Sequence, residues 1–286
     1  SRERSWLNRE IMFNIKDLVQ ATSGVLHSGV TSKRFPGVSI DTRSIREGEI
    51  FVALVGKNFD GHDFIEEAIN KGARAVVYAD AAKVRAFHKN IAYVKVPETT
   101  VALGAIARFH RQRFDIPVIA ITGSSGKTTT KEMVSWVLGA KYNILKNKGT
   151  QNNLIGVPLT LLQIHSKHDI CVVEMGTNRV GEIHQLAQIA CPTMGIITNI
   201  GPAHLEHLGD LKGVYKEKIA LIRNLVGPRI ALLNKSDIIL SKLTRLRTQP
   251  VFFFGMNRDC EFAATEITYK PQSISFVVNG MHYMEI

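Results

Sequence analysis

The chain has 286 residues, of which 45% are hydrophobic, and its formal net charge is +11 at pH 7. This length allows two domains of ordinary size, and without low-complexity tracts or an apolar run of about 20 residues the chain reads as a folded protein without membrane insertion. A positive net charge is typical of proteins that bind nucleic acid. Here, however, the basic residues are scattered among acidic ones, and no nucleic-acid-binding motif accompanies them. We therefore expect a basic surface that suits substrates carrying several phosphates.

The N-terminal segment and the cysteines indicate a compartment. Residues 1–13 carry charges without an apolar stretch, so they do not form a secretory signal, and Met12 is a candidate native start. The three cysteines, Cys171, Cys191 and Cys260, are odd in number and lack metal-ligand spacing. We expect structural thiols in a reducing cytoplasm.

The first segment, residues 1–97, is predicted to be a small α/β domain. Residues 51–54 and 73–79 are apolar enough for buried strands, and residues 62–72 between them have the pattern of a helix that ends at Gly72. A second helix is expected from Thr99 to about Phe114, leading into a strand that begins after Pro117.

The stretch "VIAITGSSGKTTTKE", residues 118–132, reads as a strand, a glycine-rich loop and a helix. Glycines let backbone N–H groups approach an anion, and the helix that follows directs the positive end of its dipole toward it. The loop has the shorter form G-x-x-G-K-T, because Ile121 stands where the longer phosphate loop has glycine, and an ordinary turn before a helix is the alternative. We predict that the nucleotide phosphates bind Gly123, Ser124, Ser125, Gly126, Lys127, Thr128 and Thr129.

Strands and helices alternate after this loop, which predicts a mostly parallel sheet in a central domain of residues 98–286. Ligands of such sheets bind beyond the carboxyl ends of the strands. Polar residues stand at these ends: Thr122, Glu174, Asn199 and Asn234. After residue 255 short alternating strands predict a small antiparallel addition.

Two side chains, the Glu174 carboxylate and the His204 imidazole, are candidate metal ligands. Glu174 follows four apolar residues and could share a magnesium ion with Thr128, the alternative being a solvated acid at a strand end. His204 lies just past a strand end near the expected phosphates, whereas His207 is better explained as a surface or core residue.

The sequence "NKSD", residues 234–237, is the same as the guanine-reading motif of GTPases. A GTPase also needs the longer phosphate loop and an Asp-x-x-Gly after a later strand, whereas here the loop has the shorter form and the strand ends in Glu174-Met175-Gly176. We therefore reject that reading.

The succession "TGSSGKTTTKE", "NNLIGVPLTLL", "EMGTNRVGEI", "TNIGPAHLEHLGDLKGV" and "NKSD" resembles the ATP-dependent Mur ligases. The segment "SIDTRSIREGEIFVALVGKNFDGHDF" is similar to their N-terminal domain, which holds the UDP part of the substrate. The resemblance runs from about Met12 to the last residue. The family carries a third, C-terminal domain for the amino component, and nothing here corresponds to it, so we expect a truncated chain.

The resemblance implies an activity in peptidoglycan precursor synthesis. ATP would phosphorylate the carboxylate of UDP-N-acetylmuramoyl tripeptide, and the amine of D-Ala-D-Ala would attack the acyl phosphate. Positioning and charge neutralisation dominate such transfer, so Lys127 and two Mg²⁺ ions would be the main agents. Thr128 and Glu174 would hold one Mg²⁺, and His204 with a carbamylated Lys218 the other.

The resemblance also assigns binding residues. Asn234 falls at the nucleotide, and the uridine side would involve Ser39, Asp41 and Arg43. The muramoyl peptide would lie near Asn152, Asn153, Thr177 and Asn178, although Asn152 and Asn153 could also form a turn before a helix at Gly156.

Lys218 is expected to need a depressed pKa, caused by Lys212, Lys216 and the metal site, and a solvated lysine is the alternative. Ala220 stands where the family has an acidic residue, which is a departure from the pattern of the second metal site.

Three function classes remain at this point. The first is a Mur-type ligase, either the tripeptide-specific member or another amide ligase of the family. The others are a P-loop NTPase with a different output and a non-catalytic UDP-sugar-binding module. We expect a cytoplasmic bacterial monomer that binds the UDP-linked substrate, binds ATP weakly and, as this fragment, does not ligate.

Overall fold

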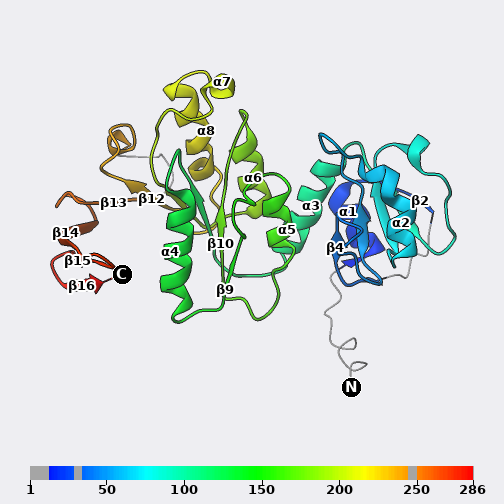
Figure 1. The fold of residues 1–286 in the computed structure, drawn as a ribbon, viewed down its shortest axis with the longest axis horizontal. Helices are drawn as coiled ribbons and strands as arrows, with labels where there is room; N and C mark the ends of the chain where they lie inside the picture. Colours follow the sequence, from blue (N-terminus) through cyan, green and yellow to red (C-terminus); the bar gives the residue numbers. More distant parts are fainter. Residues whose placement is uncertain (1–12, 29–33, 244–249, 286) are drawn as a thin grey trace. The chain divides into compact units, whose positions relative to one another are not determined.

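The computed structural model describes residues 13–28, 34–243 and 250–285. The candidate start at Met12 lies outside these ranges. The chain divides into two compact units, Ser1–Arg113 and Phe114–Ile286, and each has its own sheet (Figure 1).

The first unit is built on a five-stranded sheet of order β2-β7-β6-β5-β4. Its parallel strands are β4 (Val38–Ser39), β5 (Ile50–Val52), β6 (Ala75–Tyr78) and β7 (Ala92–Lys95). Strand β2 (Val25–Ser28) joins β7 antiparallel at one edge, and β1 (Phe13–Asn14) pairs separately with β3 (Arg34–Phe35). The predicted strands at 51–54 and 73–79 correspond to β5 and β6.

The predicted helix over residues 62–72 is a 3₁₀ turn, Gly61–Phe64, followed by α2 (Ile65–Asn70). The Asp60 side chain caps the turn by accepting a hydrogen bond from the His62 N–H at 2.9 Å. Gly72 follows α2 with φ +114°, a backbone conformation that favours glycine. Ile65 and Ala68 of α2 pack with Phe51, Val76 and other residues in the core of this unit.

The α-helices α1 (Ile15–Thr22) and α3 (Thr99–Arg111) of the first unit contact each other. Asn14 and Asp17 form a capping box at the start of α1. Since α3 falls within Ser1–Arg113, the contacts divide the chain after this helix, whereas the sequence pattern placed the boundary before it, at residue 97.

The second unit contains a nine-stranded sheet of order β16-β15-β14-β13-β12-β11-β8-β10-β9. Neighbouring strands are parallel from β9 to β14, and β14, β15 and β16 are antiparallel. The strands of the parallel part are β8 (Val118–Thr122), β9 (Ile144–Lys146), β10 (Ile170–Glu174), β11 (Met194–Ile197), β12 (Ile230–Asn234) and β13 (Val251–Gly255). The antiparallel end consists of β14 (Phe262–Tyr269), β15 (Ile274–Val278) and β16 (His282–Glu285). The predicted α/β class, with a mostly parallel sheet and an antiparallel addition, is confirmed.

The helices of the second unit are α4 (Lys127–Gly139), α5 (Gly156–Leu161), α6 (Glu182–Ala190), α7 (Leu205–Leu208) and α8 (Leu211–Arg223). Successive residues of a strand point to opposite faces of a sheet, and β11 shows which helix covers each face. Ile196 shares a core with Val134 and Leu138 of α4, while a Cβ at Gly195 would lie 2.7 Å from Ile222 of α8. Helices α4 and α8 therefore cover opposite faces of the sheet (Figure 1).

Every residue of β8 and β10 is buried, as expected for parallel strands covered on both faces. All three cysteines lie in the described ranges and none is in a disulfide. No helix in those ranges is both long and apolar enough to cross a membrane.

Candidate functional site

The phosphate-loop strand β8 lies between β10 and β11 in the middle of the parallel sheet. Thr122, its last residue, pairs with Ile197 of β11, and Ile121 pairs with Glu174 of β10. The carboxyl ends of the three strands therefore meet at one edge. The chain leaves β8 toward one side of the sheet and later returns to the other, which is the kind of switch point where ligands of α/β sheets bind.

The loop between β8 and α4 depends on two glycines. A Cβ at Gly123 would lie 1.8 Å from Thr198 Oγ1, so only glycine lets the loop pass this close to β11. Gly126 has φ +75° and is the N-cap of α4, where a side chain would be strained. The predicted strand, loop and helix are all present, as the phosphate-loop interpretation requires.

The segment after β11 braces this loop. The Asn199 side-chain oxygen accepts hydrogen bonds from the Ser124 N–H at 3.1 Å and the Ser125 N–H at 3.0 Å. Thr198 Oγ1 donates to Ser125 O at 2.6 Å, and Ser124 Oγ donates to Gly201 O at 2.8 Å. The sequence analysis placed Asn199 only at a strand end and missed this contact, which joins residues 74 and 75 positions apart.

The N-terminus of α4 is left open by this arrangement. Among the described residues, the backbone N–H groups of Gly126, Lys127 and Thr128 have no hydrogen-bond acceptor. The Lys127 ammonium lies over the loop and donates to Gly123 O at 2.9 Å and Ser124 O at 3.4 Å. Free N–H groups at a helix start beside a lysine form a site for phosphate oxygens.

Glu174 joins the loop to the next segment of the chain. Its carboxylate accepts hydrogen bonds from Thr128 Oγ1 and from Asn152 Nδ2, each at 2.7 Å, and the residue is only 2% exposed. Three residues that the sequence predicted for two separate roles, metal and substrate, therefore form one cluster around the buried Glu174 carboxylate.

Two residues that the sequence analysis missed hold Glu174 in place. The Asn147 side chain accepts from the Glu174 N–H at 2.9 Å and donates to Glu174 O at 3.2 Å. The fully buried Lys131 donates to Asn147 O at 2.9 Å and Gly149 O at 3.1 Å. Lys131 lies one helical turn after Lys127 on α4, so a second lysine in a phosphate-loop helix was the available signal.

The donor set around Thr128 suits magnesium. A hydroxyl and a carboxylate are oxygen ligands, and Mg²⁺ in nucleotide sites takes few protein ligands because water and phosphate supply the rest. Across the described ranges no group of three or more His, Cys, Asp and Glu residues could hold a metal ion by itself. The residues therefore fit a metal that arrives with a nucleotide rather than one held by the protein alone.

Lys218 is buried in α8, with 2% of its surface exposed. Burial and then the nearby Lys127 charge lower its pKa from 10.5 to about 8, while Glu217 acts in the opposite direction. The expected direction agrees, but burial and Lys127 act in place of the expected Lys212 and Lys216, which are exposed. The solvated-lysine alternative is excluded by the burial.

His204 is not brought into this cluster by any side-chain contact. It is exposed, has φ +54° and begins α7, and its ring makes no hydrogen bond to the described residues. His207 lies 3.7 Å from the Glu206 carboxylate, as a surface residue would. A second metal site involving His204 stays a prediction.

The predicted peptide-side residues have mixed surroundings. Asn153 Oδ1 accepts from the N–H groups of Ile155 at 3.0 Å and Gly156 at 2.8 Å, which is the turn before α5 that the sequence left open. Thr177 is buried, and its hydroxyl lies 2.7 Å from Arg179 O and 3.3 Å from Glu217 Oε1. Asn178 is exposed at the carboxyl edge of the sheet.

Asn234 is engaged with its own sheet. Its Nδ2 donates to Thr198 O at 2.9 Å and its Oδ1 accepts from the Ser236 N–H at 2.9 Å. This side chain joins the ends of β11 and β12, which supports the segment that braces the loop.

The predicted uridine-side residues form one turn in the first unit. Ser39 Oγ donates to Asp41 O at 3.0 Å, and the Asp41 carboxylate lies 2.6 Å from the exposed Arg43 guanidinium. The Arg43 side chain lowers the pKa of Asp41 to about 2. The turn therefore presents an ion pair at the surface of this unit.

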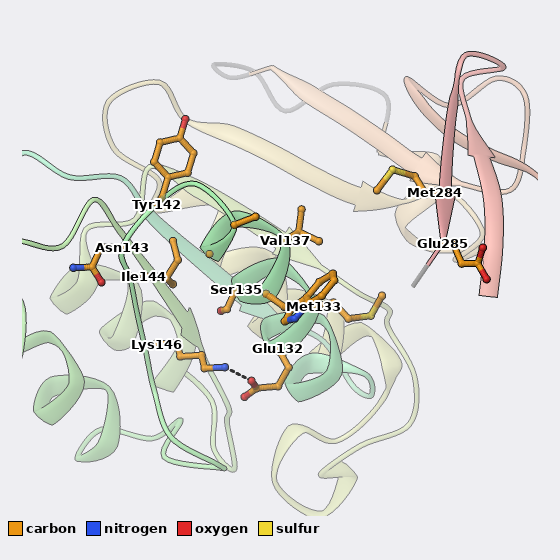
Figure 2. Close-up of a pocket in the computed structure, with 13 residues that line it drawn as sticks. Glu132, Met133, Ser135, Val137, Tyr142, Asn143, Ile144, Lys146, Met284 and Glu285 are labelled. Carbon is orange, nitrogen blue, oxygen red and sulfur yellow. Dashed lines mark hydrogen bonds and ion pairs between the residues drawn. The ribbon is translucent and has the colours of Figure 1, made fainter. Parts of the chain in front are cut away.

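A groove of about 1050 Å³ lies elsewhere in the second unit, along the outer side of α4 and next to β16 (Figure 2). Met133, Trp136 and Val137 supply apolar lining, and Lys146 pairs with Glu132 at its edge. None of the predicted site residues lines it. We therefore assign the candidate site to the phosphate loop and not to this groove.

The sequence of this chain matches family profiles and sequences of known proteins. A family profile described as "Mur ligase middle domain" matches residues 121–286, and one described as "Mur ligase family, catalytic domain" matches residues 34–112. The UDP-N-acetylmuramoyl-tripeptide–D-alanyl-D-alanine ligase of Synechocystis sp. is 42% identical over 207 residues, which are 72% of this chain and 45% of that enzyme.

Solved structures of proteins from the same family have a similar fold. The crystal structure of MurF from Acinetobacter baumannii has a TM-score of 0.86 at 30% identity, covering 96% of this chain and 60% of that one. MurF ligase from Thermotoga maritima in complex with ADP has a TM-score of 0.77 at 31% identity, covering 87% and 57%. The chain thus spans about half of the Synechocystis enzyme and 60% of the A. baumannii structure. With a middle-domain match over more than half of its residues, the chain belongs to the Mur ligase family.

Proposed function

We propose that this chain is the UDP-substrate- and ATP-binding part of a ligase that adds D-Ala-D-Ala to UDP-N-acetylmuramoyl tripeptide. ATP would activate the peptide carboxylate as an acyl phosphate, and the dipeptide amine would displace the phosphate. The relatives named UDP-N-acetylmuramoyl-tripeptide–D-alanyl-D-alanine ligase support this choice within the family.

The observation that carries the proposal is the hydrogen-bonded cluster of Thr128, Glu174 and Asn152 beside the open N-terminus of α4. Thr128, expected at the phosphates and the metal, and Asn152, expected at the muramoyl peptide, both hydrogen-bond to the Glu174 carboxylate, which supports a site where the two substrates meet. A ligase that transfers a phosphoryl group from ATP to a carboxylate needs this proximity.

The chain's own residues would act by positioning and by charge. The N–H groups of Gly126, Lys127 and Thr128 would bind phosphate oxygens, and the Lys127 ammonium would leave its carbonyl partners to neutralise charge that develops during transfer. Thr128 and Glu174 would hold a magnesium ion, which supplies further neutralisation when it is bound.

A second magnesium ion with His204 and carbamylated Lys218 belongs to the proposal as well. Carbamylation requires a neutral amine, and the lowered pKa of Lys218, about 8, makes the neutral form accessible near physiological pH. The burial of Lys218 supports this role over a surface one.

The remaining parts of the proposal follow from the substrates. Ser39, Asp41 and Arg43 would bind the uridine side of the substrate. The protein would act as a monomer in the cytoplasm, where nucleotide-linked precursors and ATP are available. The alternatives are another amide ligase of the family and a non-catalytic UDP-sugar-binding module.

Titration calorimetry with this chain separates these possibilities. UDP-N-acetylmuramoyl tripeptide should bind more tightly than the corresponding dipeptide, the substrate of a ligase one step earlier, and ATP with Mg²⁺ should bind in the same preparation. Equal affinity for the two peptides would favour a different member of the family. Absence of ATP binding alongside normal UDP-substrate binding would favour the non-catalytic module.

A further inference from the structure

Glu217 is a buried acidic residue that the proposed chemistry does not use. It lies on α8 directly before Lys218 and is 4% exposed. A carboxylate taken out of water needs hydrogen-bond donors, because its desolvation is otherwise too costly. Where those donors come from indicates what Glu217 does.

Within the described part of the chain, its hydrogen-bond donors all belong to one segment, residues 177–183, which runs from just after β10 into the first turn of α6. Oε2 accepts from the Gly181 N–H at 2.7 Å, and Oε1 accepts from the Ile183 N–H at 2.8 Å and lies 3.3 Å from Thr177 Oγ1. Two of these donors are at the N-terminus of α6, where backbone N–H groups lack helical partners and a negative charge is favoured. Glu217 therefore attaches both ends of the segment to α8.

The part of the segment that Glu217 encloses is exposed. Asn178 and Arg179 lie between the two attachment points, and their side chains face solvent at the carboxyl end of β10. The Glu182 carboxylate accepts hydrogen bonds from their backbone N–H groups, at 2.6 Å and 3.1 Å. An amide and a guanidinium are thus presented close after Glu174, on a backbone held by two carboxylates.

We propose that Glu217 is a positioning residue for the peptide substrate: it fixes residues 177–183 so that Asn178 and Arg179 meet the UDP-linked muramoyl peptide, and it has no comparable role in nucleotide binding. This inference rests on the proposed function, since it needs that substrate. None of the hydrogen bonds of Glu217 involves the phosphate loop, and the loop is braced separately by Asn199. The two ligands should therefore respond differently when Glu217 is changed.

The test compares affinities for two ligands in the same chain. In Glu217→Gln one acceptor becomes a donor that faces a backbone N–H group, so the affinity for UDP-N-acetylmuramoyl tripeptide should fall about tenfold. The affinity for ATP, measured with a chelator so that Lys218 and its metal take no part, should stay within about twofold. Glu217→Asp keeps the charge with a shorter reach and should lie between wild type and Gln. Glu266→Gln removes the same charge from an exposed position on β14 and should match wild type.

The outcomes are distinct. If the wild-type chain itself fails to bind the tripeptide substrate, the proposed function fails and not the role of Glu217 within it. The positioning role is overturned if wild type binds the tripeptide substrate and Glu217→Gln binds each ligand as tightly as wild type does. It is also overturned if Glu217→Gln loses affinity for both ligands to the same degree. Circular dichroism checks folding; if Glu217→Gln does not fold, Glu217→Asp carries the comparison, and failure of both to fold would assign Glu217 to the fold instead.

Discussion

Glu174→Gln should separate the stability of the site from its use of magnesium. The Glu174 carboxylate accepts from Thr128 Oγ1 and Asn152 Nδ2, each at 2.7 Å. Glutamine has the same shape: its oxygen can still accept from Asn152, and its NH₂ can donate to the Thr128 hydroxyl, which rotates to accept. No buried polar group loses its partner, so the free energy of unfolding should change by less than about 1 kcal/mol.

Nucleotide affinity should change in opposite directions with and without the metal. A unit charge about 5 Å from a phosphate oxygen, at an effective dielectric constant of about 20, contributes about 3 kcal/mol before solvent and counterions reduce it. We expect about half of this to remain, a factor of about ten in affinity. Without metal, ATP should bind Glu174→Gln about tenfold more tightly than wild type, because a repulsive charge is gone; with Mg²⁺ it should bind about tenfold more weakly, because a metal ligand is gone.

The assay is calorimetric titration of ATP into wild type and variant, once with excess Mg²⁺ and once with a chelator. Urea unfolding of both proteins checks the stability, and Glu266→Gln serves as the matched charge control. A shift of the same sign under both conditions would refute a metal role for Glu174. A loss of several kcal/mol in unfolding free energy would refute the isosteric exchange.

Three further predictions concern the loop and Lys218. Lys127→Ala should weaken ATP binding at least tenfold with an unchanged circular dichroism spectrum, whereas Lys141→Ala, beyond the far end of α4, should leave it unchanged; equal effects of the two would remove the basis for the phosphate-loop reading. Asn199→Ala removes the acceptor of two loop N–H groups and should weaken ATP about tenfold without affecting the UDP substrate, and unaltered ATP affinity would contradict the bracing role. Because the pKa of Lys218 is lowered from 10.5 to about 8, the unfolded chain binds more protons between these pH values, and wild type should gain up to about 3 kcal/mol relative to Lys218→Met as the pH rises through this range. Urea unfolding in CO₂-free buffer at about pH 7 and about pH 10 measures this gain, and a constant difference between the two proteins would contradict it.

Much of the fold followed from local pattern. The strands β8 and β10 are short runs of apolar residues because both faces of a parallel strand are covered, and this leaves a signal that needs no tertiary knowledge. The glycines and lysine of the phosphate loop were equally visible, since their chemistry depends on neighbours in sequence. The α/β class and the family resemblance could therefore be read from the chain alone.

Contacts between distant segments could not be read in this way. Asn199 braces a loop 74 and 75 positions earlier, and Glu217 holds N–H groups 34 and 36 positions away, but each looks in the sequence like any polar residue at a strand end or on a helix. The pKa of Lys218 follows the same rule: the sequence offered Lys212 and Lys216 as causes, whereas the fold buries the amine and brings Lys127 near it.

The sequence by itself thus determined the glycine-rich loop with its lysine and the helix after it, because the loop and its helix are consecutive in the chain. The tertiary structure alone decided which of the predicted residues lie in contact. Thr128, Asn152 and Glu174 come from three segments that meet only because β8 and β10 are adjacent in the sheet. Strand order depends on the packing of the whole unit, and hydrogen bonds between buried side chains form only after that order is set.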